Sequence, residues 1–134
     1  MIYRIEDNND ILAIIISSRY NESGIHFFTP DHFSQQFGYM NHPKGKIIEP
    51  HIHNPVPREV EYTQEVLFIK SGKVRVDFYN DKKEYLENFI LGTGDAILLI
   101  RGGHGFTILE DAEMYEVKQG PYVGDADKTR FDGI

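Results

Sequence analysis

Residues 65–79 read EVLFIKSGKVRVDFY, and this stretch decides the fold class. It is rich in β-branched and aromatic residues on both sides of a central Ser71-Gly72, which is typical of strands. A serine followed by a glycine favours a tight turn. We therefore predict two strands, Glu65–Lys70 and Lys73–Tyr79, joined as a hairpin at Ser71-Gly72.

The same pattern of short strands and turn residues continues on both sides of this stretch. Thr29-Pro30 looks like a helix start, and the glycine at position 38 limits that helix to one or two turns. Eight further strands are predicted at residues 11–17, 25–28, 36–40, 46–53, 85–91, 96–100, 104–109 and 113–118. About ten strands with at most one short helix predict an all-β sandwich or barrel, and a barrel can hold a small ligand in its mouth.

The length of 134 residues predicts one domain spanning residues 1–134. The barrel core is expected at about 45–118, and the polar stretch 120–134, rich in glycine and aspartate, is expected to be an extended C-terminal tail. The chain has no cysteine, which excludes disulfides, thiolate metal sites and cysteine nucleophiles.

The formal net charge is −7, from 14 basic and 21 acidic residues. Such an acidic chain is not expected to bind nucleic acid or anionic membranes in general. The longest apolar run, Ile11–Ile16, is too short to span a bilayer, and the N-terminus lacks the layout of a signal peptide. We therefore expect a cytoplasmic protein.

His51-Ile52-His53 is the first feature that carries chemistry. Residues two apart on a strand point to the same face, so both imidazoles could reach one ion. Neutral imidazole is a good ligand for divalent first-row metals. Histidine pairs of this kind often bind nothing, so the surrounding residues decide the interpretation.

The spacing around this pair resembles the two motifs of the cupin superfamily. The first motif, G-x5-H-x-H-x3,4-E-x6-G, is similar to the series Gly45, His51, His53, Glu65 and Gly72. The second motif, G-x5-P-x-G-x2-H-x3-N, is matched in order by Gly94, Gly102 and His104. The resemblance extends over about residues 45–109.

The sequence departs from the cupin pattern at three points. The gap between His53 and Glu65 is longer than in the family, so Glu65 is aligned through its distance to the following glycine, and Glu59 and Glu61 remain rival carboxylates. Ile100 replaces the proline of the second motif. The turn before the second-motif histidine is one residue shorter, and the final asparagine is missing.

The resemblance implies a cupin-type double-stranded β-helix, which is a jelly-roll barrel. It also implies one divalent metal ion, such as Zn, Fe, Mn or Ni, with one or two open coordination positions. The implied metal ligands are His51, His53, Glu65 and His104.

Function follows less directly from the resemblance, because this fold hosts many activities. The chain is similar in size to small cupins that include nucleotide-sugar ketoisomerases. We expect a metalloenzyme acting on a small polar metabolite, of the sugar isomerase or epimerase type. The alternatives are a non-catalytic cupin that binds a metal or a small ligand, and an iron-dependent dioxygenase.

Several charged or polar side chains near the proposed mouth could take part in catalysis. Arginine suits a carboxylate or phosphate on a substrate, and glutamate and lysine suit acid–base chemistry. The candidates are Arg58, Arg101, Tyr115, Glu116 and Lys118. Two arrangements are possible on the last predicted strand. Either Glu116 and Lys118 point inward, or Tyr115 and Val117 do.

The segments Ala96–Ile100 and His104–Leu109 are apolar at successive positions, so both faces of each predicted strand are apolar, and Ile11–Ile16 adds a third such strand. One cavity does not need this much apolar surface. A homodimer that buries part of it is therefore predicted.

Overall fold

The computed structural model describes residues 1–134, which form two compact units. The barrel unit comprises Met1–Tyr20 and Tyr62–Ile134, and the insert unit comprises Asn21–Glu61. The single helix is a four-residue 3₁₀ helix, η1 (Gly124–Asp127). The chain therefore has no helix with the length and apolar character needed to cross a membrane.

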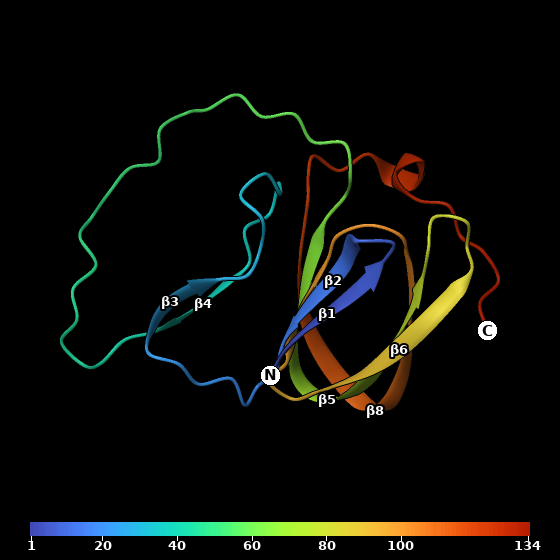
Figure 1. Ribbon diagram of the computed structural model, residues 1–134, viewed down its shortest axis with the longest axis horizontal. Coiled ribbons are helices and arrows are strands. Elements are labelled where there is room, and N and C mark those ends of the chain that lie inside the picture. Colours follow the sequence, from blue (N-terminus) through green and yellow to red (C-terminus); the bar gives the residue numbers. More distant parts are fainter. The chain divides into compact units, whose positions relative to one another are not determined.

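Six antiparallel strands form one sheet in the barrel unit, and this sheet curls into a half-barrel (Figure 1). The order along the sheet is β1-β2-β7-β5-β6, and β8 pairs with the other edge of β5. The strands are β1 (Ile2–Asp7), β2 (Asp10–Ile16), β5 (Glu65–Tyr79), β6 (Tyr85–Gly92), β7 (Ala96–Leu99) and β8 (Gly103–Lys118).

The curl of the sheet depends on a bend in the middle of β5. Its first part, Glu65–Phe68, pairs with β7, and its last part, Lys73–Tyr79, pairs with β6. The register between β5 and β8 shifts repeatedly around Ser71 and Lys73, as β-bulges do. Gly72 has a φ of 93° there, a conformation that glycine adopts without strain.

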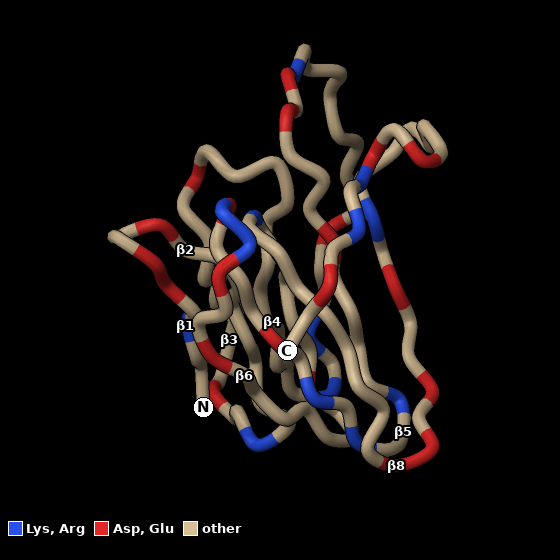
Figure 2. Tube along the Cα trace, turned by 90° about the vertical axis from the view of Figure 1, so that its right-hand side faces the viewer, with Lys and Arg blue, Asp and Glu red and all other residues tan.

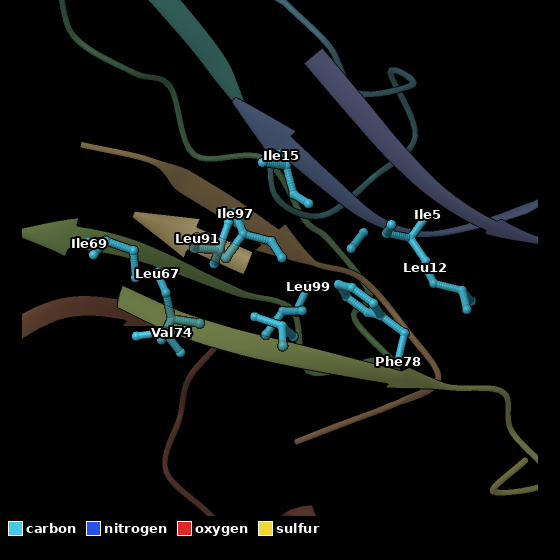
Figure 3. Close-up of a cluster of buried hydrophobic side chains, with 12 residues drawn as sticks. Ile5, Leu12, Ile15, Leu67, Ile69, Val74, Phe78, Leu91, Ile97 and Leu99 are labelled. Carbon is cyan, nitrogen blue, oxygen red and sulfur yellow. The ribbon is translucent and has the colours of Figure 1, made fainter. Parts of the chain in front are cut away.

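The core lies on the inner face of the curled sheet, where aliphatic side chains from β1, β2, β5, β6 and β7 meet (Figure 3). Leu67, Ile69 and Val74 come from the two sides of the bend in β5, and all three belong to this core. Burying the apolar surface of these strands is the main driving force for folding this unit. The core residues are Ile5, Leu12, Ala13, Ile15, Leu67, Ile69, Val74, Val76, Phe78, Leu91, Ile97 and Leu99.

The insert unit contains one small hairpin-like sheet of β3 (Gly24–Phe27) and β4 (Gly38–Asn41). No helix follows Thr29; instead, the amide of Phe37 donates a hydrogen bond to the Thr29 hydroxyl at 3.1 Å. The Gln36 side chain donates to three backbone carbonyls, at 3.0 to 3.3 Å. These side-chain bonds satisfy the backbone groups of the loop and take the place of a helical turn.

The prediction of an all-β chain with at most one short helix is confirmed, but the count of ten strands is wrong, because there are eight. Ser71-Gly72 is a bulge within the continuous strand β5 and not a hairpin, and residues 104–109 and 113–118 are likewise parts of one strand, β8. Residues 46–53 form no strand. The finer prediction of a double-stranded β-helix stays a prediction, as does the assignment of a single domain.

Basic and acidic residues are interspersed along the chain (Figure 2). At the bend, two cross-strand ion pairs join β5 to β8. Lys70 Nζ lies 3.3 Å from Glu113 Oε2, and Lys73 Nζ lies 3.4 Å from Glu110 Oε1. Exposed pairs of this kind stabilise only slightly, so the bend is held mainly by the backbone ladder and the core.

Candidate functional site

The Glu65 carboxylate and the His104 imidazole form the centre of the candidate site in the barrel unit. His104 Nε2 lies 2.9 Å from Glu65 Oε1. The His104 and Glu65 side chains are only 27% and 17% exposed, respectively, so both groups are largely withdrawn from water. The imidazole hydrogen bond is the largest influence on Glu65 and holds its pKa below the ordinary value of 4.5, against the opposing effect of burial.

The bend in β5 brings these two residues together from opposite ends of a long ribbon. Glu65 pairs with the last residue of β8, whereas His104 pairs with Phe78 near the end of β5. In a straight strand, thirteen residues would separate the two ends by about 43 Å. Contact between Glu65 and His104 therefore requires that the β5/β8 ribbon curl back on itself, as it does in Figure 1.

Glu116 and Lys118 complete a polar cluster around Glu65. Residues directly opposite each other in a ladder share a face, and these two lie opposite Leu67 and Glu65, so both are on the inner face. A hydrogen bond to Glu65 is the largest influence on Glu116 and raises the pKa of its carboxyl group, with burial adding to the effect. The Lys118 ammonium lowers the pKa of both carboxyl groups. The cluster thus pairs an ionised carboxylate with a carboxyl group that retains its proton to higher pH.

His51 and His53 belong to the insert unit, and neither is on a strand. Their rings are nevertheless neighbours, with centroids 5.1 Å apart. His51 Nδ1 lies 2.8 Å from the carbonyl oxygen of Glu49, which leaves Nε2 as the nitrogen available to a metal. Histidine ligands commonly use one ring nitrogen for such a carbonyl and the other for the metal.

Tyr115 and Arg101 make their contacts with residues other than Glu65 and His104. Tyr115 lies on the outer face, where its ring stacks on Phe68 at a centroid distance of 6.5 Å. The Arg101 guanidinium lies 2.8 Å from Asp81 and 3.8 Å from Asp10, and over the Tyr62 ring at 5.1 Å. These contacts give Arg101 a role in joining turns of the barrel unit.

The other charged candidates are on the insert unit. Arg58, Glu59 and Glu61 are exposed and lie outside any strand. The structure thus brings together Glu65 with His104 and Glu116, and His51 with His53. That all four proposed ligands meet at one ion stays a prediction.

Sequence reasoning missed the contribution of the C-terminal tail. The Thr63 hydroxyl, two residues before Glu65, donates a hydrogen bond to the Asp127 carboxylate. Lys128, the next residue, lowers the pKa of Glu116 through its charge. Asp127 is 64 residues from Thr63 and belongs to no motif, so local spacing offered no means of finding this contact.

The donor atoms of the Glu65–His104 pair and of the His51–His53 pair are of the kinds that bind divalent ions. Imidazole nitrogen and carboxylate oxygen are usual ligands of Zn, Fe, Mn and Ni. Within each unit, no three histidine, aspartate or glutamate side chains are gathered closely enough to hold a metal ion.

Comparisons of the chain with protein-family models, with curated proteins and with solved structures gave no match.

Proposed function

We propose that this chain is a metal-binding cupin that acts on a small polar metabolite. The ion would be held by three imidazoles and one carboxylate, namely those of His51, His53, His104 and Glu65. The observation that carries the proposal is the 2.9 Å contact between Glu65 and His104, two proposed ligands from distant parts of the chain, on the inner side of a curled sheet. The side-by-side rings of His51 and His53 add support.

A sugar or nucleotide sugar is the substrate class that we propose, with isomerisation or epimerisation as the reaction. The ion, when bound, would supply Lewis-acid polarisation of a substrate carbonyl. Glu116 is the proposed acid–base group, because it lies beside Glu65 and its raised pKa keeps its proton available at higher pH than in an ordinary glutamate. Lys118, on the same face, would attract a negatively charged substrate group.

Metal analysis of the purified protein tests the proposal directly. We expect close to one divalent ion per chain after incubation with metal and removal of the excess. His51→Ala, His53→Ala and His104→Ala should each lose most of the metal, because each removes a donor. Glu65→Gln should weaken binding, whereas Glu59→Gln and Glu61→Gln should have little effect. Full metal content in all three histidine variants would refute the site.

A metal-free ligand-binding barrel is the second candidate, and one observation favours it. Glu65 and His104 already satisfy each other through a direct hydrogen bond, so they need no ion to be stable. A protein that takes up no metal, yet is stabilised by a member of a metabolite panel in thermal-shift measurements, would support this alternative.

A further inference from the structure

The C-terminal tail is attached to the barrel unit just before Glu65. The amide of Gln119, directly after β8, donates a hydrogen bond to the carbonyl of Gln64 at 3.0 Å. Farther along the tail, Asp127 accepts a hydrogen bond from the Thr63 hydroxyl. Both contacts are within two residues of Glu65, so the first anchor of the tail lies on the carboxylate side of the candidate site.

A second anchor lies on the histidine side. The Phe131 ring meets the Tyr79 ring edge-on, with centroids 5.0 Å apart, and Lys83 Nζ lies 5.9 Å from the Phe131 centroid. A Cβ atom placed on Gly103 would come within 2.9 Å of Phe131 Cζ, so the aromatic ring packs closely against the Gly103 backbone. Gly103 directly precedes His104.

These anchors define a short span across the site. Residues 127 and 131 are only four apart in the chain, yet Asp127 is attached to Thr63, two residues before Glu65, and Phe131 packs against Gly103, directly before His104. The span between them therefore connects the starts of β5 and β8, which the Glu65–His104 hydrogen bond also joins. Lys128 lies in this span, and its charge acts on Glu116 of the same cluster.

We propose that residues 127–131 form a clasp that closes over the Glu65–His104 pair and must open before a ligand can reach His104. The clasp is held by the Thr63–Asp127 hydrogen bond and by the contacts of the Phe131 ring with Tyr79 and Lys83, and beyond it the Ile134 amide donates to the Tyr79 hydroxyl at 3.2 Å. The strands of the barrel unit are instead held by ladders and a buried core. Segments with few buried contacts open at much lower free energy than core strands. The clasp can therefore open while the barrel unit stays folded, and the proposal holds with or without a bound metal.

Chemical modification of histidine by diethyl pyrocarbonate, located by mass spectrometry, tests the clasp. The measurement is made on the full chain with EDTA present, so that no metal shields the ring. Phe131→Ala removes the aromatic anchor and should increase the modification rate of His104 several-fold. Asp127→Ala removes the other anchor and should act in the same direction. Phe131→Tyr keeps the ring and should retain the wild-type rate.

Two controls make the result specific. Tyr122→Ala removes another tail aromatic, which is 87% exposed, and should leave the His104 rate unchanged. His26 and His32 of the insert unit serve as internal references whose rates should not change. An unchanged His104 rate in both anchor variants would overturn the proposal. So would a rise shared by all the histidines, because it would show general loosening in place of a local clasp.

Discussion

Glu65 and Glu116 have chemically identical side chains, but the fold shifts their pKa values in opposite directions. The His104 hydrogen bond favours the ionised form of Glu65, whereas the hydrogen bond to Glu65 favours the protonated form of Glu116. The pKa values diverge because β8 places the Glu116 carboxyl group beside the Glu65 carboxylate, which is already hydrogen-bonded to the His104 imidazole. Pairs of groups with diverging pKa values are typical of sites that move protons.

The lowered pKa of Glu65 predicts a pH-dependent contribution to stability. The folded protein binds this proton less tightly than the unfolded chain, so the stabilisation is fully present above about pH 4.5 and is lost as the pH falls through the lower folded pKa. Glu65→Gln should therefore reduce the free energy of unfolding at neutral pH. The difference from wild type should shrink below pH 4.5. Urea denaturation across this pH range, with EDTA present, measures it.

Glu116→Gln should not reduce the free energy of unfolding at neutral pH, in contrast to Glu65→Gln. Its raised pKa means that the folded protein holds this proton more tightly, so stability is lost as the pH rises through the folded value. The variant removes that loss and should be at least as stable as wild type at neutral pH, and equal to it in acid, where Glu116 is protonated in both states. A variant clearly less stable than wild type at neutral pH would contradict the raised pKa.

At the scale of elements, the bend in β5 determines whether the site exists. Gly72 has a φ of 93°, and an added Cβ would lie 2.1 Å from the carbonyl oxygen of Asp111 on β8. Gly124 also has a positive φ, 67°, but an added Cβ there would meet nothing within 4 Å. Comparing alanine substitutions at the two positions therefore distinguishes the cost of backbone strain from the cost of a steric clash.

We predict that Gly72→Ala lowers the free energy of unfolding by more than Gly124→Ala does. Strain in the left-handed region costs about 1–2 kcal/mol at either position. The clash with β8 adds roughly 1–3 kcal/mol at Gly72 only, because the neighbouring atoms are backbone and cannot rotate away. Chemical denaturation of both variants measures the difference. Equal losses would show that the bend can relax to accept a side chain.

The elements could be predicted from the sequence where strand patterns and turns agreed. β2, β6 and β7 lie within one or two residues of their predicted bounds. β5 was divided wrongly, because a glycine that permits a turn also permits a bulge, and only the register with β8 distinguishes the two. β1 was not predicted, although Asn8-Asn9, both with positive φ, is a recognisable hairpin turn.

The site was predictable to the extent that its members fall in spaced motifs. Glu65 and His104 were both selected from spacing, and they are in contact. The strand expected for His51 and His53 is wrong, because no ladder forms there, although the two rings are neighbours. Asp127 and Phe131 could not be found, because their contacts with Thr63 and Tyr79 depend on tertiary packing alone.

At the scale of the molecule, one argument for a homodimer fails and another takes its place. The apolar segment Ala96–Ile100 contains β7, which lies between β2 and β5 with its leucine and isoleucine side chains buried, so it offers no surface to a partner. β8, however, is an edge strand that pairs only with β5 and exposes apolar side chains, including Ile108. Long exposed edges of this kind favour pairing with another chain.

We therefore predict a homodimer that forms through β8. Light scattering at micromolar concentration should give twice the chain mass of 15.5 kDa. Ile108→Lys should shift the protein towards monomer, because it places a charge on this surface. Ile90→Lys on β6 is a matched control, since both isoleucines are 51% exposed, and it should leave the mass unchanged. A monomeric mass for the wild type would contradict the prediction.

The proposed metal site links stability to both pH and chelator. The ligands come from distant parts of the chain, so the ion should bind the folded protein far better than the unfolded one. At free metal about 100 times the dissociation constant, this preference adds roughly 2.7 kcal/mol, which corresponds to a rise in Tm of about 10 °C. Chelator should remove this rise at neutral pH.

Acid should remove it as well, because an imidazole must be neutral to bind a metal, so protons compete with the ion. The effect of chelator on Tm should therefore fade as the pH falls. His51→Ala should melt at one temperature with and without chelator, because its site lacks a donor. If wild-type Tm ignores both chelator and added metal at neutral pH, the Glu65–His104 pair is a structural hydrogen bond, and the metal-free barrel becomes the better account of the chain.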